Sequence, residues 1–247
     1  MDIQEVILQT PQLARQKVFY QNILGLPMVA ETNDSITLQA GATLLHFKEV
    51  EAESLYHIAF AIPRNAFIQA KAWVRERIPL LPITKSLPVL PADSPLRVQG
   101  KKGEDEVYFP VVRARSFYCL DAANNILKFI VYEDLEQEIS GPFGASSILS
   151  VSEIGLPAED VLDVARQLQE QVGLEPYPLS RPASRDFAYL GDAHGQLVIV
   201  RTGHAWMPTE TVLASIAPVH LTISGRQEQE LQLSPYPYAI RVNSRKN

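Results

Sequence analysis

The chain has 247 residues, of which 46% are hydrophobic and 20% charged, so it can bury one large core or two smaller ones and is not a disordered chain. A formal net charge of −6 argues against a general nucleic-acid binder, and the sequence has no apolar run of the about 18 residues that a membrane-spanning helix needs. The start, MDIQEV, lacks the features of a signal peptide, and a single cysteine, Cys119, fits a reducing compartment. We therefore expect a cytoplasmic protein with neither nucleic acid nor membrane as a partner.

The main pattern of the sequence is a repeat of an alternating strand, a short amphipathic helix and a Gly-Leu stop. It occurs at Ile3–Leu26 (IQEVILQTPQLARQKVFYQNILGL) and again at Glu153–Leu174 (EIGLPAEDVLDVARQLQEQVGL). A third copy, His57–Leu80 (HIAFAIPRNAFIQAKAWVRERIPL), has Ile-Pro in place of the glycine. Internal repetition of this kind predicts the architecture before any chemistry is considered.

The first two units each predict a βαβββ module. In the first, Val6 and Leu8 alternate with polar residues, and Phe19 and Ile23 lie four residues apart on one side of a helix over about 12–24. Strands are expected next at 35–39 and 43–50. In the second unit the same signals predict a strand at 56–62, a helix at about 67–78 and strands at about 106–111, 116–120 and 126–132.

The segments between the units are rich in proline and glycine. We expect 79–102 to form a long irregular loop that crosses a rim of the fold. The linker 134–146 contains Gly-Pro-Phe-Gly and is the best boundary, which predicts two domains, 1–136 and 146–247. A third module follows the linker. A fourth opens at 219–224 but has no helix, so it is expected to be truncated to a hairpin with 239–242.

Three strings of this sequence carry a resemblance to a known family. EVILQTPQLARQKVFYQNILGL, YHIAFAIP and FYCLDAANNILKFIVYE resemble the first strand and helix, the opening of the second module and its closing turn and strand in the vicinal oxygen chelate superfamily. That superfamily includes glyoxalase I, extradiol ring-cleaving dioxygenases and the bleomycin and fosfomycin resistance proteins. The resemblance implies an α+β fold of tandem βαβββ modules that form incomplete barrels, the fourth being truncated. It does not decide the function, because the superfamily contains several chemistries and some pure binders.

The resemblance also implies a metal site. In the family two paired modules surround a metal ion, and its ligands come from the first and last strand of each module. Carried over to this chain, the first-strand positions are Glu5 and His57 and the last-strand positions are His46 and Lys128. Glu5, His46 and His57 would form a two-histidine, one-carboxylate set, which suits Fe, Mn, Zn or Ni and leaves positions open for substrate.

Lys128 is the residue that departs from the family pattern. An ammonium there would lie near the metal, and two unit charges 4 Å apart interact by roughly 4 kcal/mol at an effective dielectric of about 20. Two interpretations stay open. In one, a metal chelates two adjacent oxygens of a substrate, and Lys128 is a catalytic acid or stabilises an oxyanion. In the other, Glu5 and Lys128 form an ion pair, and His46 and His57 are hydrogen-bonded core residues.

The third and fourth units repeat the ligand positions incompletely. The counterpart of Glu5 is Glu153, but its last-strand position falls near Ile199, so we do not expect a second metal centre. His220 could pair with Glu153 and is interpreted as a structural residue. Trp206, in the turn GHAWMP, is expected to plug one end of a barrel.

The two interpretations predict two functions. The first is a metal-dependent enzyme, a glyoxalase-like lyase or an extradiol-type dioxygenase, that acts on a small vicinal-oxygen substrate. The second is a metal-free small-molecule binding or resistance-type protein. Gln9, Phe109 and Tyr118 are the candidates to line the cavity and contact the ligand. Family proteins often dimerise to complete their barrels, so a homodimer and internal pairing of the modules both stay open.

Overall fold

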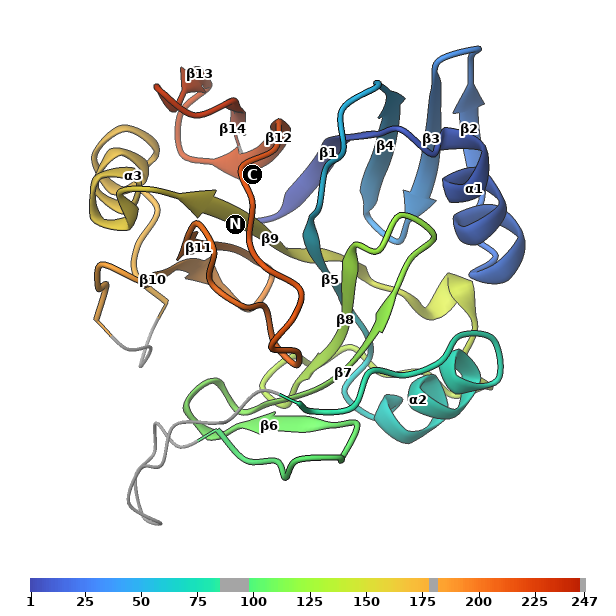
Figure 1. Ribbon diagram of the computed structural model, residues 1–247. Coiled ribbons are helices and arrows are strands. Elements are labelled where there is room, and N and C mark those ends of the chain that lie inside the picture. The colour runs from blue at the N-terminus through green and yellow to red at the C-terminus, as the bar shows by residue number, and fades with distance from the viewer. Residues whose placement is uncertain (85–97, 178–181, 245–247) are drawn as a thin grey trace.

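The computed structural model describes residues 1–84, 98–177 and 182–244. Within these residues the chain forms two mixed seven-stranded sheets, with the helices at the flanks (Figure 1). The fold is α+β and modular, as the sequence predicts: the first two modules are βαβββ, and the third has three strands and one helical stretch within the described residues. Much of the proline-rich segment that was expected to cross a rim, 85–97, lies outside the described residues.

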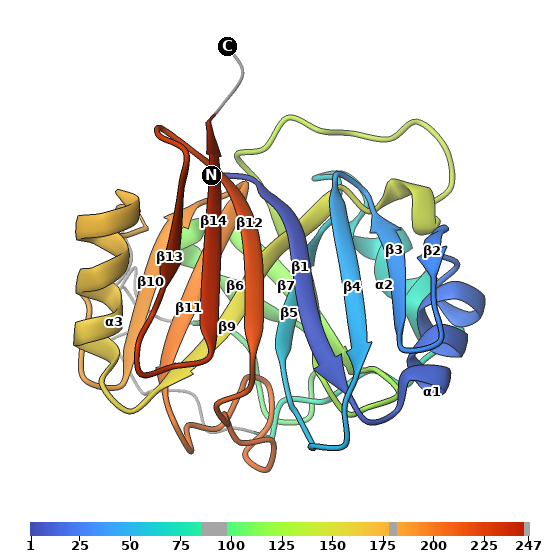
Figure 2. The same cartoon turned by 90° about the horizontal axis from the view of Figure 1, so that it is seen from above.

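Sheet A joins the first part of the chain to the last, so that the blue and red strands lie side by side in Figure 2. Its order is β13-β14-β12-β1-β4-β3-β2. The strands are β1 (Ile3–Thr10), β2 (Met28–Glu31), β3 (Ser35–Ala40), β4 (Thr43–Glu49), β12 (Val219–Gly225), β13 (Gln229–Gln232) and β14 (Tyr238–Ser244).

Sheet B contains the middle of the chain in the order β10-β11-β9-β5-β8-β7-β6. Its strands are β5 (His57–Ala61), β6 (Val107–Phe109), β7 (Ala114–Leu120), β8 (Ile126–Tyr132), β9 (Ser150–Ala158), β10 (Phe187–Asp192) and β11 (Gly195–Arg201). In both sheets the first and last strands of a module are parallel neighbours, for example β1 with β4 and β5 with β8.

The modules pair differently from the sequence prediction. Sheet A joins the first module to the fourth through antiparallel β1 and β12, and sheet B joins the second to the third through antiparallel β5 and β9. The prediction that modules one and two pair within 1–136 is therefore wrong, and the sheets do not follow the division into 1–136 and 146–247. The physical reason is that every module presents its first strand as an open edge with a similar alternating pattern, which does not encode the partner.

The fourth module also differs from its predicted hairpin. β12 and β14 run parallel, and β13 pairs antiparallel with the outer side of β14. The fourth module thus keeps the neighbouring first and last strands of the other modules, although no helix stands between β12 and β13. A hairpin between β12 and β14 would have required them to be antiparallel.

Each of the first three modules has its helix. α1 (Leu13–Lys17) continues as a π-helix, η1 (Val18–Ile23), α2 spans Phe67–Arg75, and α3 (Val161–Gln167) continues as a second π-helix, η4 (Leu168–Val172). Gly25 and Gly173 follow the first and third of these helices with φ of +72° and +75°, a conformation that glycine adopts without strain. None of the helices in the described residues combines the length and apolarity that crossing a membrane requires.

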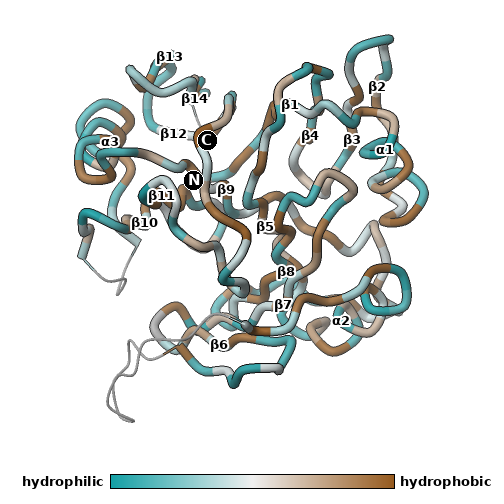
Figure 3. Tube along the Cα trace, in the orientation of Figure 1, coloured by the Kyte–Doolittle hydropathy of each residue, from teal (hydrophilic) through white to brown (hydrophobic). Residues whose placement is uncertain are grey.

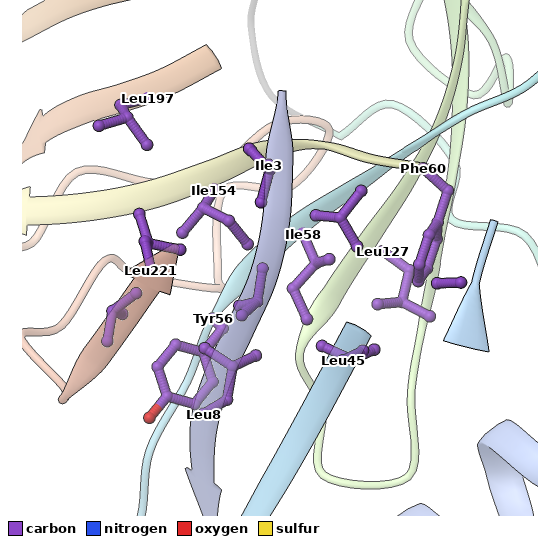
Figure 4. Packing of buried hydrophobic residues seen from close by; sticks show 14 of the residues in the cluster. Ile3, Leu8, Leu45, Tyr56, Ile58, Phe60, Leu127, Ile154, Leu197 and Leu221 are labelled. Carbon is purple, nitrogen blue, oxygen red and sulfur yellow. The ribbon is translucent and has the colours of Figure 1, made fainter. Parts of the chain in front are cut away.

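The hydrophobic core lies between the two sheets. In Figure 4, Leu8, Leu45 and Leu221 of sheet A face Ile58 and Ile154 of sheet B, and all five are buried. In Figure 3 hydrophobic residues, drawn in brown, are concentrated along β5 and β8 near the centre of the molecule. Because side chains alternate along a strand, the intervening residues point to the opposite face of each sheet. Those two opposite faces carry the polar side chains that the sequence singled out.

Candidate functional site

The structure divides the predicted metal-ligand set between the two sheets. Glu5 and His46 lie on β1 and β4 of sheet A, whereas His57 and Lys128 lie on β5 and β8 of sheet B. The predicted convergence of Glu5, His46 and His57 on one centre is therefore wrong, since it assumed that modules one and two share a half-barrel. The alternative ion pair between Glu5 and Lys128 is wrong for the same reason.

The predicted ligand-contacting residues are divided in the same way. Gln9 lies at the end of β1, on the same face as Glu5 by strand alternation. Phe109 and Tyr118 belong to sheet B, where the Phe109 ring lies 4.9 Å from Nζ of Lys128. Tyr118 is buried and pairs across the strands with Lys128, and its hydroxyl accepts a hydrogen bond of 3.2 Å from Ser116.

On sheet A, two threonines hold Glu5 and His46 in place. Nε2 of His46 lies 2.9 Å from Oε1 of Glu5, and the other carboxylate oxygen accepts a hydrogen bond of 2.9 Å from Thr222 of β12. On the far side of the imidazole, Nδ1 is 2.8 Å from the hydroxyl of Thr37 on β3. Both side chains are partly exposed, at 22% for His46 and 33% for Glu5, although Nε2 of His46 is itself buried.

His220 lies on the same face of sheet A. Ile7 of β1 pairs with His46 on one side and with His220 on the other, so the three side chains point the same way. His220 is exposed. Arg241, two residues beyond the partner of His220 on β14, also lies on this face, where Glu230 and, more weakly, Glu5 raise the pKa of its guanidinium.

The donor pair on sheet A fits a shared cation. Within the described residues, Nε2 of His46 has no hydrogen-bond partner although it is only 2.9 Å from Glu5, because the two groups are not aligned for a bond. Two ligands about 2.1 Å from one ion and at right angles lie about 3.0 Å apart, close to the observed distance. No three His, Cys, Asp or Glu side chains of the described ranges come together as a metal-binding group, so His220 would have to rotate to become a third ligand.

Sheet B carries a buried ion pair at the matching position. Nζ of Lys128 lies 2.7 Å and 2.9 Å from the two carboxylate oxygens of Glu153 on β9, and the residues are 6% and 1% exposed. The hydroxyls of Tyr132 and Tyr189 each donate a hydrogen bond of 2.8 Å to Oε1 of Glu153. Burial would raise the pKa of Glu153, but Lys128 and His57 together lower it below its ordinary value, so the carboxylate is charged.

His57 is shielded by an indole. The rings of His57 and Trp206 stack with their centroids 4.7 Å apart. The slot for the indole depends on Gly155 of β9, where a Cβ atom would lie 2.6 Å from the six-membered ring of Trp206. Burial lowers the pKa of His57 to about 4, with Lys128 adding to this effect and Glu153 opposing it, so the ring is neutral at pH 7. Trp206 therefore covers His57 on the polar face of sheet B, and its predicted place at one end of a barrel stays a prediction.

The neutral His57 predicts an acid-dependent loss of stability. The unfolded chain protonates His57 near pH 6.5 and the folded chain only near pH 4, so in this range the unfolded state binds more protons. The contribution of neutral His57 to the unfolding free energy is complete above about pH 6.5. It is lost as the pH falls toward 4, and the total loss is roughly 3 kcal/mol. Urea unfolding across this range should show that the unfolding free energy of His57→Gln changes less with pH than that of the wild type or of a variant of the exposed His194. The same pH dependence in all three proteins would contradict this prediction.

Comparison with known proteins supports the fold. No family model matches the chain, and no curated protein matches it. Among solved structures, the chain is similar to a proposed dioxygenase from Bacillus subtilis at 12% identity and a TM-score of 0.56, over 99% of this chain and 85% of that one. It is similar to glyoxalase I from Zea mays at 11% identity and a TM-score of 0.52, over 98% of this chain and 91% of that one. These similarities show the fold alone, and the chain shares its fold with these two structures.

Several residues of both polar clusters were not found from the sequence. Thr37 and Thr222 on sheet A and Tyr132, Tyr189 and Gln196 on sheet B carried no motif. The predicted pairing of His220 with Glu153 is wrong, because His220 lies on sheet A and Glu153 on sheet B. The sequence did place His220 and Glu153 on the first strand of a module, as it did Glu5 and His57. This position indicates a contact partner only when the pairing of the modules is known.

Proposed function

We infer that the protein is a metal-dependent enzyme of the vicinal oxygen chelate type and that its site is the polar face of sheet A. Glu5 and His46 would hold the ion, and His220 would complete the two-histidine, one-carboxylate set in place of His57. Such an ion is a Lewis acid with open coordination positions, which suits a substrate with two adjacent oxygens. The observation that carries this proposal is the contact of 2.9 Å between His46 and Glu5, in which Nε2 has no hydrogen bond within the described residues.

The surrounding residues support this assignment. If Nδ1 of His46 donates its proton to Thr37, Nε2 carries a lone pair, which a metal ligand requires. Thr222 fixes the other oxygen of Glu5, so the carboxylate keeps its orientation before an ion arrives. Arg241, on the same face, could hold an anionic part of the substrate. Lys128 has no part in this site, because it lies on sheet B.

The second candidate is a metal-free small-molecule binding protein on the same face. The small number of metal-ligating side chains favours this candidate, because the described residues bring together only Glu5 and His46 and no third His, Cys, Asp or Glu. In this alternative Nε2 of His46 carries a proton, and the pair recognises the ligand through hydrogen bonds. The two candidates differ in whether ligand binding survives removal of divalent ions.

We expect the wild-type protein to bind one equivalent of Co²⁺ or Zn²⁺, measured by calorimetry after dialysis against chelator. Glu5→Gln and His46→Gln should abolish this binding, because each removes one of the two main ligands. Thr37→Val should weaken it by about tenfold, because a partner that orients a ligand histidine typically contributes that much. His220→Gln should also weaken it if His220 is the third ligand.

The matched control is Glu49→Gln, since Glu49 is an exposed carboxylate at the end of β4, on the opposite side from His46 by alternation. It should bind the metal as the wild type does. Acetohydroxamate, a small molecule with two adjacent oxygens, should then bind only to metal-loaded protein. Binding of acetohydroxamate that persists in chelator, together with no metal uptake, would favour the metal-free alternative.

The partners and the location stay predictions. A cytoplasmic location is consistent with the buried, unpaired Cys119, whose thiol pKa is raised by burial and which is therefore not a reactive thiol. The first and fourth modules and the second and third modules pair within one chain, so a homodimer is not needed to join modules in pairs. Light scattering would measure the oligomeric state directly.

A further inference from the structure

The two half-barrels have matching positions for their polar residues. In sheet A, Ile7 of β1 pairs with both His46 and His220. In sheet B, Ala59 of β5 pairs with both Lys128 and Glu153. Lys128 is therefore the counterpart of His46, and Glu153 is the counterpart of His220. Two positions of sheet B that correspond to His46 and His220 are thus occupied by an ammonium and a carboxylate that face each other.

The ammonium of Lys128 satisfies Glu153 much as a bound cation would. Its Nζ contacts both carboxylate oxygens, at 2.7 Å and 2.9 Å. Oε1 also accepts the hydroxyl protons of Tyr132 and Tyr189, so three donors share this one atom. A carboxylate offers about four lone-pair sites in all, which leaves little capacity for a further cation. The residues of sheet B therefore do not fit a metal ion.

The charge around this pair is already balanced. Glu153 is the one carboxylate that the described residues bring into contact with Lys128, and His57 beside them is neutral. A divalent ion at Glu153 would add two positive charges next to the ammonium, in a region that Trp206 and its neighbours keep away from water. Such like charges repel strongly where solvent does not screen them.

One potential ligand nearby is not in use. Nδ1 of His57 is buried and has no hydrogen-bond partner within the described part of the chain. The side-chain oxygen of Gln196 lies 3.0 Å from the hydroxyl of Tyr132, which donates its proton to Glu153, and the amide nitrogen of Gln196 is also without a partner there. Without Lys128, the cluster would consist of a carboxylate, an imidazole nitrogen and polar oxygens, which is a donor set for a divalent metal ion.

We propose that the Lys128 ammonium is the resident cation of the second half-barrel, that it excludes divalent ions from Glu153 and His57, and that its removal converts this cluster into a divalent metal site. The two sheets then have different tasks. Sheet A presents an open polar face, whereas sheet B uses the same strand positions for a sealed, internally neutralised cluster. The proposal concerns sheet B and does not depend on metal binding at sheet A.

The experiment uses the full chain with Glu5→Gln in every variant, so that sheet A does not contribute. Lys128→Ala in this background should gain about one equivalent of Co²⁺, seen as visible absorption bands of a protein-bound ion, and should bind Zn²⁺ at least tenfold more tightly than the Glu5→Gln parent. Adding Glu153→Gln or His57→Gln to Lys128→Ala should remove the gained binding. Zn²⁺ should also raise the melting temperature of Lys128→Ala but not that of the parent.

Lys128→Gln tests the proposal if the alanine variant does not fold, because glutamine keeps much of the side-chain volume and can still donate to Glu153. It should gain metal binding in the same sense. A folded Lys128→Ala or Lys128→Gln protein that takes up no more Co²⁺ than the parent would overturn the proposal. Metal gained by Lys128→Ala but retained when Glu153 is also replaced would overturn it as well, because the ion would then be bound elsewhere.

Discussion

A Lys128→Met variant is expected to lose about 3–5 kcal/mol of unfolding free energy, because it leaves a buried carboxylate without its counter-charge. Glu153 is only 1% exposed and would keep two tyrosine hydroxyls as its donors. Methionine fills most of the space of the lysine stem, so the loss reports the charge rather than a cavity. Urea unfolding at pH 7 measures it.

Two comparisons show whether the effect belongs to the buried pair. The double variant Lys128→Met/Glu153→Gln should recover at least half of the loss, since neither charge then remains buried. Lys17→Met removes a lysine from an ion pair of the same type and length, 2.7 Å to Glu31, but with side chains 37% and 46% exposed. It should cost at most about 1 kcal/mol. Similar losses for Lys17→Met and Lys128→Met would show that burial does not decide the strength of the pair.

A Trp206→Ala variant is expected to lose about 3–5 kcal/mol of unfolding free energy and to raise the pKa of His57. Trp206 is 4% exposed and fills the slot between His57 and Gly155, so its removal leaves a cavity that admits water. Hydration favours the protonated imidazole, and the His57 pKa should move from about 4 toward 6.5. Denaturant unfolding gives the first quantity, and titration of the His57 ring protons by NMR gives the second.

The other tryptophan of the chain is the matched control. Trp73 lies on α2, where it packs edge-on against Phe143 and beneath the guanidinium of Arg77, away from sheet B's polar cluster. It is only partly buried, so Trp73→Ala should cost less than Trp206→Ala and should leave the His57 titration unchanged. If His57 still titrates near pH 4 in Trp206→Ala, the indole is not what shields the imidazole.

The local elements followed from the sequence because their signals are local. The alternation of Val6 and Leu8 predicted the strand that became β1, and the spacing of Phe67, Ala70 and Val74 predicted the helix α2. The alternation on β1 also placed Glu5 on the polar face of that strand, since a strand that buries every second residue fixes the direction of the rest. The repeat of these elements was enough to predict the modular α+β fold.

The partner of each module was decided only by the tertiary structure. β1 could pair with any strand of similar pattern, and its pairing with β12 rather than with the second module moved His57 and Lys128 to a different sheet. The partner of Lys128 changed with it, from Glu5 to Glu153. Strand pairing is set by backbone hydrogen bonds, which are the same for every sequence, and by the burial of whole faces. The neighbours of a residue along the chain therefore determine on which face of the sheet its side chain lies. They do not determine which charged side chain it contacts.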